Sequence, residues 1–409
     1  MRFYLLDSAM IEPHGHHDHF ARGFLKVAGE YDCEPVVCAH RTVKESLQSQ
    51  VQARPTFSNS MYWSASSDPY DGPLTDFRVR NARFVRDLDA LKGAVSDDDV
   101  LLLPTAIPAE LFGLAQWIQA NGLKPRLAAY FHRAEPGPLT PGGLTPALLR
   151  TAARHVGQAQ PADLWVGATN RKLGEALSPI IGRELHVAPS VTFYNDAPVP
   201  PPRPLDGRPL RIGFLGSARG EKGYDVIPDL IRAASAAQLP MRFFVQCHGF
   251  DRPLVEKYQA LRDEPQVELF GRWLTDEEMV RLVDHVDIVA MPYDRARYAS
   301  MVSGVFTLAV GHGKPALAPS GTWMAEQIEA GEAVGLVYDG EDVDAVLDAL
   351  RRMAADLPAL SRRAVEAAPL WRRDNSGETL VRRLFDWAGV RPRTATAAAP
   401  MAATAGTAP

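Results

Sequence analysis

The chain has 409 residues, of which 46% are apolar and 23% charged, and its formal net charge is −5. This is a globular composition, and the chain is too long for one ordinary core, so we expect two domains. The mild negative charge excludes a basic nucleic-acid-binding surface, and three cysteines exclude a disulfide framework. The sequence contains neither a signal-peptide pattern nor a membrane-length apolar run, so we expect a cytoplasmic protein. Association with the inner face of the membrane stays open.

In the first half, short apolar runs predict strands, and amphipathic segments between them, such as 20–29 and 109–119, predict helices. The strands are expected at residues 3–6, 35–39, 100–103, 127–131, 164–167 and 186–188. Residues 196–209 are dense in proline and polar residues, which predicts an extended linker.

In the second half the same alternation continues. Strands are expected at residues 211–215, 242–246, 267–270, 288–291, 315–318 and 335–337. Thr275 and Glu278 are spaced as a capping box and predict the start of a helix there. Residues 393–409 are rich in alanine and threonine, without large side chains, and we expect them to be disordered.

Strands that alternate with helices indicate parallel sheets. The predicted fold class is therefore α/β, with two doubly wound Rossmann-like domains facing a cleft. We expect a first domain at 1–195, the linker at 196–209, a second domain at 210–375 and a C-terminal helix at 376–392. Ligands of such sheets bind beyond the carboxyl ends of the strands.

Residues 216–223 read GSARGEKG and follow a predicted strand. We expect a helix to open directly after this loop, so that its N-terminus and the mobile charges of Arg219 and Lys222 form an anion site. Such a site can hold a diphosphate without a metal ion. The alternative is a surface loop with solvated charges.

Three segments together resemble the donor-binding half of retaining GT-B glycosyltransferases, of the group 1, family 4-like kind. They are GSARGEKG at 216–223, VELFGRWLTDEEMVRLVDHVDIVAMPY at 267–293 and SGVFTLAVGHGKPALAP at 303–319. The resemblance implies that the donor diphosphate contacts Gly216, Arg219, Lys222, Ser303, Gly304 and Val305. It places the nucleobase along Gly271, Arg272, Trp273 and Leu274.

The resemblance implies that 210–375 is the nucleotide-sugar-binding domain, that 1–195 is the acceptor-side domain, and that the helix at 376–392 crosses back to the first domain. The first half resembles this family more loosely. The resemblance puts Gly15 in a loop near the donor phosphates and His132 beside the donor sugar, although a histidine that caps a strand end is an equal alternative. His16 and His17 would lie on the acceptor side. Tyr62, Trp63 and Tyr70 are candidates for stacking on an acceptor sugar, with a role in pinning a loop to the core as the favoured alternative.

The implied reaction is transfer of a sugar from a nucleotide diphosphate sugar, with retention and without a metal or other cofactor. His132, Arg219 and Lys222 would be the catalytic residues, and the acceptor would be a glycan, a lipid-linked sugar or a small molecule. The sequence departs from the family at Ser300 and Leu308, where two glutamates are usual. The ribose would then need another partner, for which we consider the residues just upstream: Asp294, Arg295, Arg297 and Tyr298.

Residues 14–19 read HGHHDH, a pattern that supplies metal ligands in metallo-β-lactamase-like hydrolases. A metal-dependent hydrolase is therefore an alternative, although the surrounding βα alternation does not suit that fold. A non-catalytic GT-B protein that binds a glycan or a partner is a further alternative, because both usual glutamates are missing.

Overall fold

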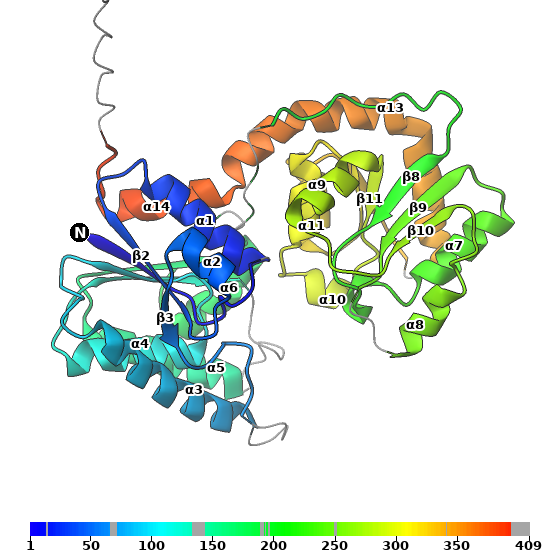
Figure 1. Ribbon diagram of the computed structural model, residues 1–409. Helices are drawn as coiled ribbons and strands as arrows, with labels where there is room; N and C mark the ends of the chain where they lie inside the picture. Colours follow the sequence, from blue (N-terminus) through cyan, green and yellow to red (C-terminus); the bar gives the residue numbers. More distant parts are fainter. Residues whose placement is uncertain are drawn as a thin grey trace, which may run out of the picture.

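The computed structural model describes residues 1–13, 15–65, 72–132, 144–188, 192, 194, 197–248, 252–340 and 342–393, with only the backbone described for 252–255. The chain forms two α/β bodies, each built on a parallel sheet (Figure 1). The predicted fold class is confirmed.

The first sheet has the strand order β3-β2-β1-β4-β5-β6-β7, and all its described pairs are parallel. Its strands are β1 (Arg2–Leu6), β2 (Glu34–His40), β3 (Arg54–Phe57), β4 (Val100–Leu103), β5 (Arg126–Phe131), β6 (Asp163–Ala168) and β7 (His186–Val187). β1 lies at the centre, so the residues that follow it are at the middle of the carboxyl edge. The sequence did not predict β3, which is a four-residue run containing a proline.

Helices cover both faces of this sheet and bury one apolar cluster on each face. One face carries α1 (His16–Ala28), α2 (Glu45–Val51) and α14 (Gly377–Trp387), and the other α3 (Gly72–Leu88), α4 (Pro108–Ala120), α5 (Leu144–Ala159) and α6 (Arg171–Ile181), with a short 3-10 turn η1 (Asp89–Leu91). The result is a three-layer domain in which the central strands β1, β4 and β5 are buried almost completely.

The second sheet has the order β10-β9-β8-β11-β12-β13. Its strands are β8 (Leu210–Phe214), β9 (Met241–Gln246), β10 (Val267–Phe270), β11 (Ile288–Ala290), β12 (Ala316–Pro319) and β13 (Gly335–Tyr338). Its helices are η2 (Gly220–Lys222), α7 (Ile227–Ala236), α8 (Arg252–Gln259), α9 (Asp276–His285), α10 (Arg295–Tyr298), α11 (Gly304–Gly311), α12 (Trp323–Glu329) and α13 (Val343–Asp374). The order reverses between β8 and β11, which is where a doubly wound sheet binds ligands.

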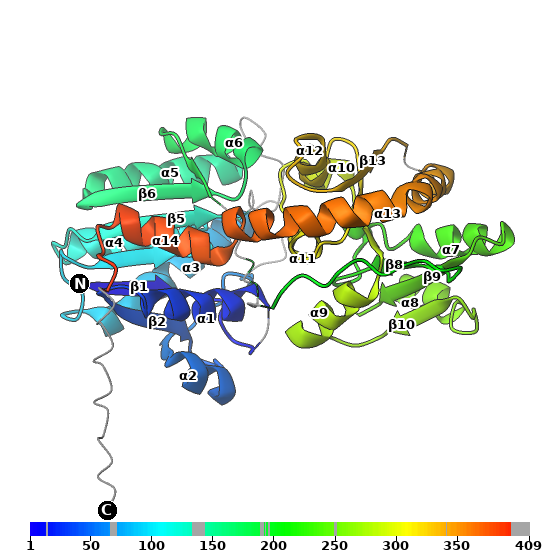
Figure 2. The same ribbon diagram turned by 90° about the horizontal axis from the view of Figure 1, so that it is seen from above.

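The long helix α13 joins the two bodies (Figure 2). Its first half packs in the core of the second domain through Leu350, Met353 and Leu357, and it contains Pro358 and Pro369. A proline inside a helix removes a backbone hydrogen bond and favours a bend. The chain then returns to the first domain as α14, which packs beside α1.

Polar contacts also connect the domains directly. The amide of Asn170 donates to the carbonyl of Ser300 at 2.8 Å, and Lys172 forms an ion pair with Glu326. The Tyr194 hydroxyl donates to the Thr307 carbonyl at 2.8 Å. Residues 197–209 connect the two sheets without helix or strand, and residues 394–409 of the predicted tail lie outside the described residues.

Candidate active site

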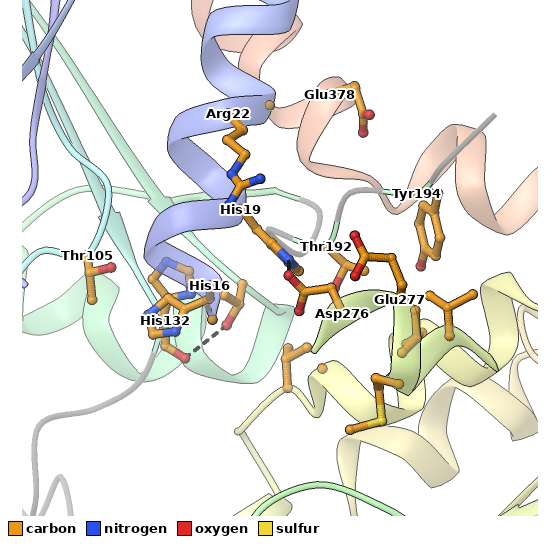
Figure 3. A pocket seen from close by; sticks show the side chains of 18 of the residues that line it. His16, His19, Arg22, Thr105, His132, Thr192, Tyr194, Asp276, Glu277 and Glu378 are labelled. Carbon is orange, nitrogen blue, oxygen red and sulfur yellow. Dashed lines mark hydrogen bonds and ion pairs between the residues drawn. The ribbon is translucent and has the colours of Figure 1, made fainter. Parts of the chain in front are cut away.

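A cavity of about 870 Å³ lies between the two domains (Figure 3). Its walls come from the carboxyl-edge loops and helix N-termini of both sheets. The first domain contributes Gly15, His16, His19, Arg22, Gly23, Lys26, Tyr62, Thr105, His132 and Thr169; the second contributes Asp276, Glu277, Met279, Val280, Arg281, Met301, Val302, Gly304 and Leu308; Thr192, Tyr194 and Glu378 complete the lining. The cavity is where the doubly wound architecture predicts a ligand.

The loop after β8 lies next to the cavity: Gly216, Arg219 and Lys222 do not line it, but Gly216 lies beside Val305, which follows the cavity residue Gly304. Gly216 has a φ of +94°, and its amide donates to the side chain of Gln246 at 2.7 Å. A Cβ atom on Gly216 would lie 2.7 Å from Nζ of Lys222 and 3.0 Å from a methyl of Val305. Glycine is therefore required here both by the backbone conformation and by the close approach of the lysine.

Lys222 is almost completely buried, at 8% exposure. Its Nζ lies 5.8 Å from the ring centre of Tyr293. Burial, together with the neighbouring charge of Arg219, lowers the pKa of Lys222 to about 8. An anion bound next to this amine would stabilise its charged ammonium form.

The N-terminus of α11 reaches the same place. Ser303 is buried and caps the helix, because its hydroxyl accepts from the amide of Phe306 at 3.3 Å. The amides of Gly304 and Val305 belong to the first turn, where backbone N–H groups have no partner inside the helix. Val305 is next to Gly216, and Gly304 lines the cavity. The structure thus brings together the β8 loop and α11, as an anion site requires.

Two details of the sequence prediction are wrong. The charges are not both mobile, since Lys222 is buried and only the Arg219 side chain, at 52% exposure and 3.1 Å from Glu221, reaches solvent. The loop also does not open directly into a helix. The short 3-10 turn η2 comes first, and α7 begins at Ile227, so Lys222 and the α11 N-terminus provide the positive potential instead.

The first domain presents a histidine wall. Gly15 precedes α1 with a φ of +84°, and His16 begins that helix. The rings of His16 and His132 are 5.8 Å apart, and Nε2 of His132 is 2.8 Å from the carbonyl of Pro104 (Figure 3). His132 therefore holds a strand end and also faces the cavity. On the opposite wall, Asp276 pairs with His19 across the domain boundary.

The HGHHDH segment does not gather into a metal site over its described residues, 15–19. Asp18 is fully buried and binds Arg22, His17 binds Asp7, and His19 binds Asp276. Within the described part of the chain, no three histidine, cysteine or acidic side chains are placed to hold a metal ion. His14 lies outside that part. The geometry does not favour the hydrolase alternative.

The predicted nucleobase segment follows β10. Gly271, Arg272 and Trp273 are exposed, whereas Leu274 is buried. The Trp273 ring lies edge-on to His248 at 5.7 Å. None of these four described residues lines the cavity. The carbonyl of His248 accepts from the amide of Ala218 at 2.9 Å, so the segment is connected to the β8 loop, and its contact with a base stays a prediction.

Where the two usual glutamates are missing, Leu308 lines the cavity and the Ser300 carbonyl binds Asn170. Most of the candidate substitutes have structural roles. Asp294 caps α10, Arg295 donates to the Gly340 carbonyl at 2.7 Å, and Tyr298 is buried against Tyr293. Arg297 is exposed. A ribose partner is not identified by these contacts.

Several cavity residues were not singled out from the sequence. Asp276 and Glu277 lie between the two residues of the predicted capping box, and Arg22 lies within a predicted helix. These three residues come together at the cavity only because the two domains face each other, and no local sequence pattern predicts that arrangement. Asp7 is different, because a polar residue directly after a central strand is a usable signal. Tyr62, at 52% exposure, lines the cavity and is not the core residue that the favoured alternative required. Trp63 packs against Arg83, and Tyr70 lies outside the described residues.

Comparison with protein families adds an independent observation. Residues 209–356 match the family described as "Glycosyl transferases group 1". The second domain is a glycosyltransferase domain. The matched range includes Gly216, Lys222 and the α11 N-terminus, and the predicted enzyme class is confirmed.

Solved structures of similar fold cover nearly the whole chain. A glycosyltransferase from Rickettsia africae is 13% identical, with a TM-score of 0.64 over 95% of this chain and 97% of its own. HepE from Anabaena, in complex with UDP and glucose, is 15% identical, with a TM-score of 0.64 over 95% and 99%. An E. coli structure described as trehalose-6-phosphate bound with UDP-2-fluoro glucose is 14% identical, with a TM-score of 0.64 over 96% and 100%. These similarities show the GT-B fold.

No curated protein sequence matches the chain. Among the helices that the structure describes, none combines the length and the apolar character needed to cross a bilayer.

Proposed function

We propose that the protein transfers a glycosyl group from a nucleoside diphosphate sugar to an acceptor hydroxyl. The observation that carries this proposal is the buried Lys222 amine, which lies against Gly216 beside the N-terminus of α11. A buried ammonium and unpaired helix amides are together suited to a diphosphate. The family match over the same residues supports this interpretation.

The position of Lys222 and the α11 amides suits the charge that develops during sugar transfer. When the bond from the sugar to the diphosphate breaks, negative charge develops on the leaving group. Groups that are already aimed at that charge stabilise the transition state more than the ground state. Removal of one such donor typically costs about 3 kcal/mol, or roughly a hundredfold in rate. Lys222, Arg219 and the α11 amides would have this role, and His132 would orient the sugar.

We further propose retention of configuration without a metal ion. The acceptor would attack the face of the sugar that the diphosphate leaves, and the departing diphosphate would take the hydroxyl proton. The resemblance in the donor half supports retention, and the protein's own cations would supply the charge that a metal supplies elsewhere. UDP is the first nucleotide to test, because it is present in the HepE complex. Glycans, lipid-linked sugars and small molecules remain the acceptor classes proposed.

Calorimetric titration with UDP and GDP tests the donor site. We expect micromolar binding of one nucleotide to the wild type, in the presence of a chelator, and at least a hundredfold weaker binding to the Arg219→Ala, Lys222→Ala double variant. Arg232→Ala is the matched control, because it removes an exposed cation of the same domain that pairs only with Asp229 at 2.8 Å among its described contacts. Equal binding by the double variant and the control would contradict the proposed site. Loss of binding in chelator would contradict metal independence.

Retention has its own measurement. The product of transfer to a simple acceptor, followed by proton NMR from the first minutes, should keep the anomeric configuration of the donor sugar. A product of opposite configuration would contradict the proposed same-face mechanism while leaving the donor site intact.

A further inference from the structure

A chain of hydrogen bonds leads from the interior of the first domain to the cavity. Asp7 directly follows the central strand β1 and is 3% exposed. Its Oδ1 accepts from the amide of Ala9 at 3.0 Å, and its Oδ2 is 2.8 Å from Nδ1 of His17. Nε2 of His17 is in turn 3.0 Å from the hydroxyl of Tyr62.

The partners determine which way these bonds run. An ionised carboxylate only accepts hydrogen bonds, so Nδ1 of His17 carries a proton and donates it to Asp7. In the neutral ring Nε2 is then an acceptor, and the Tyr62 hydroxyl donates to it. A phenol oxygen that has given its proton in this way offers lone pairs to a further donor. Asp7 thereby sets Tyr62 as a hydrogen-bond acceptor toward the cavity.

The loop that carries Tyr62 is fastened to α3. Ser64 donates to Asp76 at 2.7 Å, and Arg80 donates to the backbone carbonyls on both sides of Tyr62, those of Met61 and Trp63. These contacts hold the loop at its flanks. These flanking contacts fix the position of Tyr62, which is itself half exposed and lines the cavity.

The surroundings of Tyr62 suit a sugar hydroxyl. Its oxygen lies 3.4 Å from Nε2 of His16, whose ring faces that of His132. Gly304, at the N-terminus of α11, lines the same cavity from the second domain. A hydroxyl bound at Tyr62 would therefore lie between the histidine wall and the place proposed for the donor diphosphate.

We propose that Tyr62 binds the reacting hydroxyl of the acceptor, and that His17 and Asp7 are positioning residues that keep its oxygen an acceptor. This inference rests on the proposed function and adds the acceptor side to it. The substrate class it implies is a compound with a free hydroxyl group. The hydroxyl proton still leaves with the diphosphate, so Tyr62 orients the nucleophile and is not consumed or oxidised.

Hydrolysis of the donor tests this inference without a known acceptor, because water then occupies the place of the hydroxyl. The probe is UDP-glucose or GDP-glucose, according to which nucleotide binds. Tyr62→Phe keeps the ring and removes only the oxygen, and we expect it to lower the hydrolysis turnover number about tenfold, the effect of one lost hydrogen bond. His17→Gln should lower it similarly. The nucleotide Kd should change less than twofold in both variants.

Tyr31→Phe is the matched control. It likewise removes only a phenol oxygen from the first domain, at a side chain that packs 4.8 Å from Phe385 and does not line the cavity. Its turnover should equal that of the wild type, and thermal melting should confirm that all variants fold.

Wild-type turnover in Tyr62→Phe would overturn the inference. A nucleotide sugar that the wild type binds but does not measurably hydrolyse would overturn it as well. A parallel rise in nucleotide Kd would overturn it too, since Tyr62 would then belong to the donor site. If neither UDP nor GDP binds the wild type, the proposed function itself fails and this inference falls with it, which the titration shows before any hydrolysis is measured.

Discussion

Lys222 combines burial with an ionisable amine at the candidate diphosphate site. Its pKa of about 8 means that the amine begins to lose its proton just above neutral pH. A bound diphosphate stabilises the ammonium and raises this pKa, so binding must take up a proton around pH 8. Affinity for the nucleotide should therefore fall as the pH rises from 7 to 9.

Calorimetry at pH 8 in two buffers of different ionisation enthalpy measures this uptake directly. We expect a fraction of a proton, on the order of one half, to be taken up per nucleotide bound. Lys222→Arg keeps its charge over the whole range and should abolish the uptake. An uptake that persists in this variant would assign the proton to another group.

Gly216 makes the lysine's position possible, and its substitution is the sharpest steric test of the site. In Gly216→Ala the new methyl would meet Nζ of Lys222, in a backbone conformation that alanine disfavours. We expect a loss of about 1–3 kcal/mol in the free energy of unfolding, together with loss of nucleotide binding.

Gly220→Ala is the control for this change. Gly220 lies in the same loop, but a methyl there would meet open space and its φ is not positive. Chemical denaturation and nucleotide titration should show near-wild-type behaviour for Gly220→Ala. If both variants bind nucleotide equally well, the close packing of Gly216 and Lys222 does not matter for the ligand.

At the residue scale, the sequence indicated which residues belong to the site but not whether they are buried or what they contact. Arg219 and Lys222 stand out because a strand, a glycine and two cations follow one another. That Lys222 is buried could not be predicted, since its neighbours Tyr293 and Val305 come three strands later in the chain. The Tyr62–His17–Asp7 chain likewise combines the residue after β1, the first turn of α1 and the loop after β3, which only the folded sheet brings together.

Among the elements, α14 packs against partners that are far away in the sequence. It is the last described helix but packs in the first domain, where Phe385 is fully buried. The Phe385 ring lies 4.9 Å from Phe3, 4.8 Å from Tyr31 and 5.8 Å from Phe24. The amphipathic spacing of residues 377–387 indicates a helix. Its partner depends on the bend of α13, which contains Pro358 and Pro369.

Phe385→Ala should therefore destabilise the first domain. Truncation of a buried phenylalanine typically costs about 3–5 kcal/mol. Differential scanning calorimetry should show the first-domain transition move to lower temperature, while the second-domain transition stays in place. Leu370→Ala, at a position 54% exposed on α13, is the control and should shift neither. A shift of both transitions by Phe385→Ala would mean that the two domains unfold as one unit.

The elements also show where the local patterns are insufficient. β3 is short and contains a proline, which argues against a strand, yet it pairs with β2 at the edge of the sheet, where proline is tolerated. The helix expected directly after the glycine loop does not begin there, because the short turn η2 comes first and places Lys222, and α7 begins at Ile227. Both differences lie at sheet edges and turns, where tertiary contacts outweigh local preference.

For the whole molecule, the two domains face each other through few direct polar contacts. Lys172 pairs with Glu326 and His19 with Asp276, and all four side chains are partly exposed. Such pairs are each worth about 0–1 kcal/mol. They are therefore too weak to hold the domains rigidly, but strong enough to shift an equilibrium between closed and more open arrangements several-fold.

We therefore expect the double variant Lys172→Ala, His19→Ala to change domain arrangement more than stability. Its melting temperatures should stay within a few degrees of the wild type, because neither residue belongs to a core. Its radius of gyration from small-angle X-ray scattering should rise, and a bound nucleotide that contacts both domains should bring it back toward the wild-type value. Arg171→Ala is the matched control, since Arg171 pairs with Glu175 of its own helix at 3.0 Å. If the double variant and the control scatter alike, with and without nucleotide, then these two ion pairs do not determine how far the cavity opens.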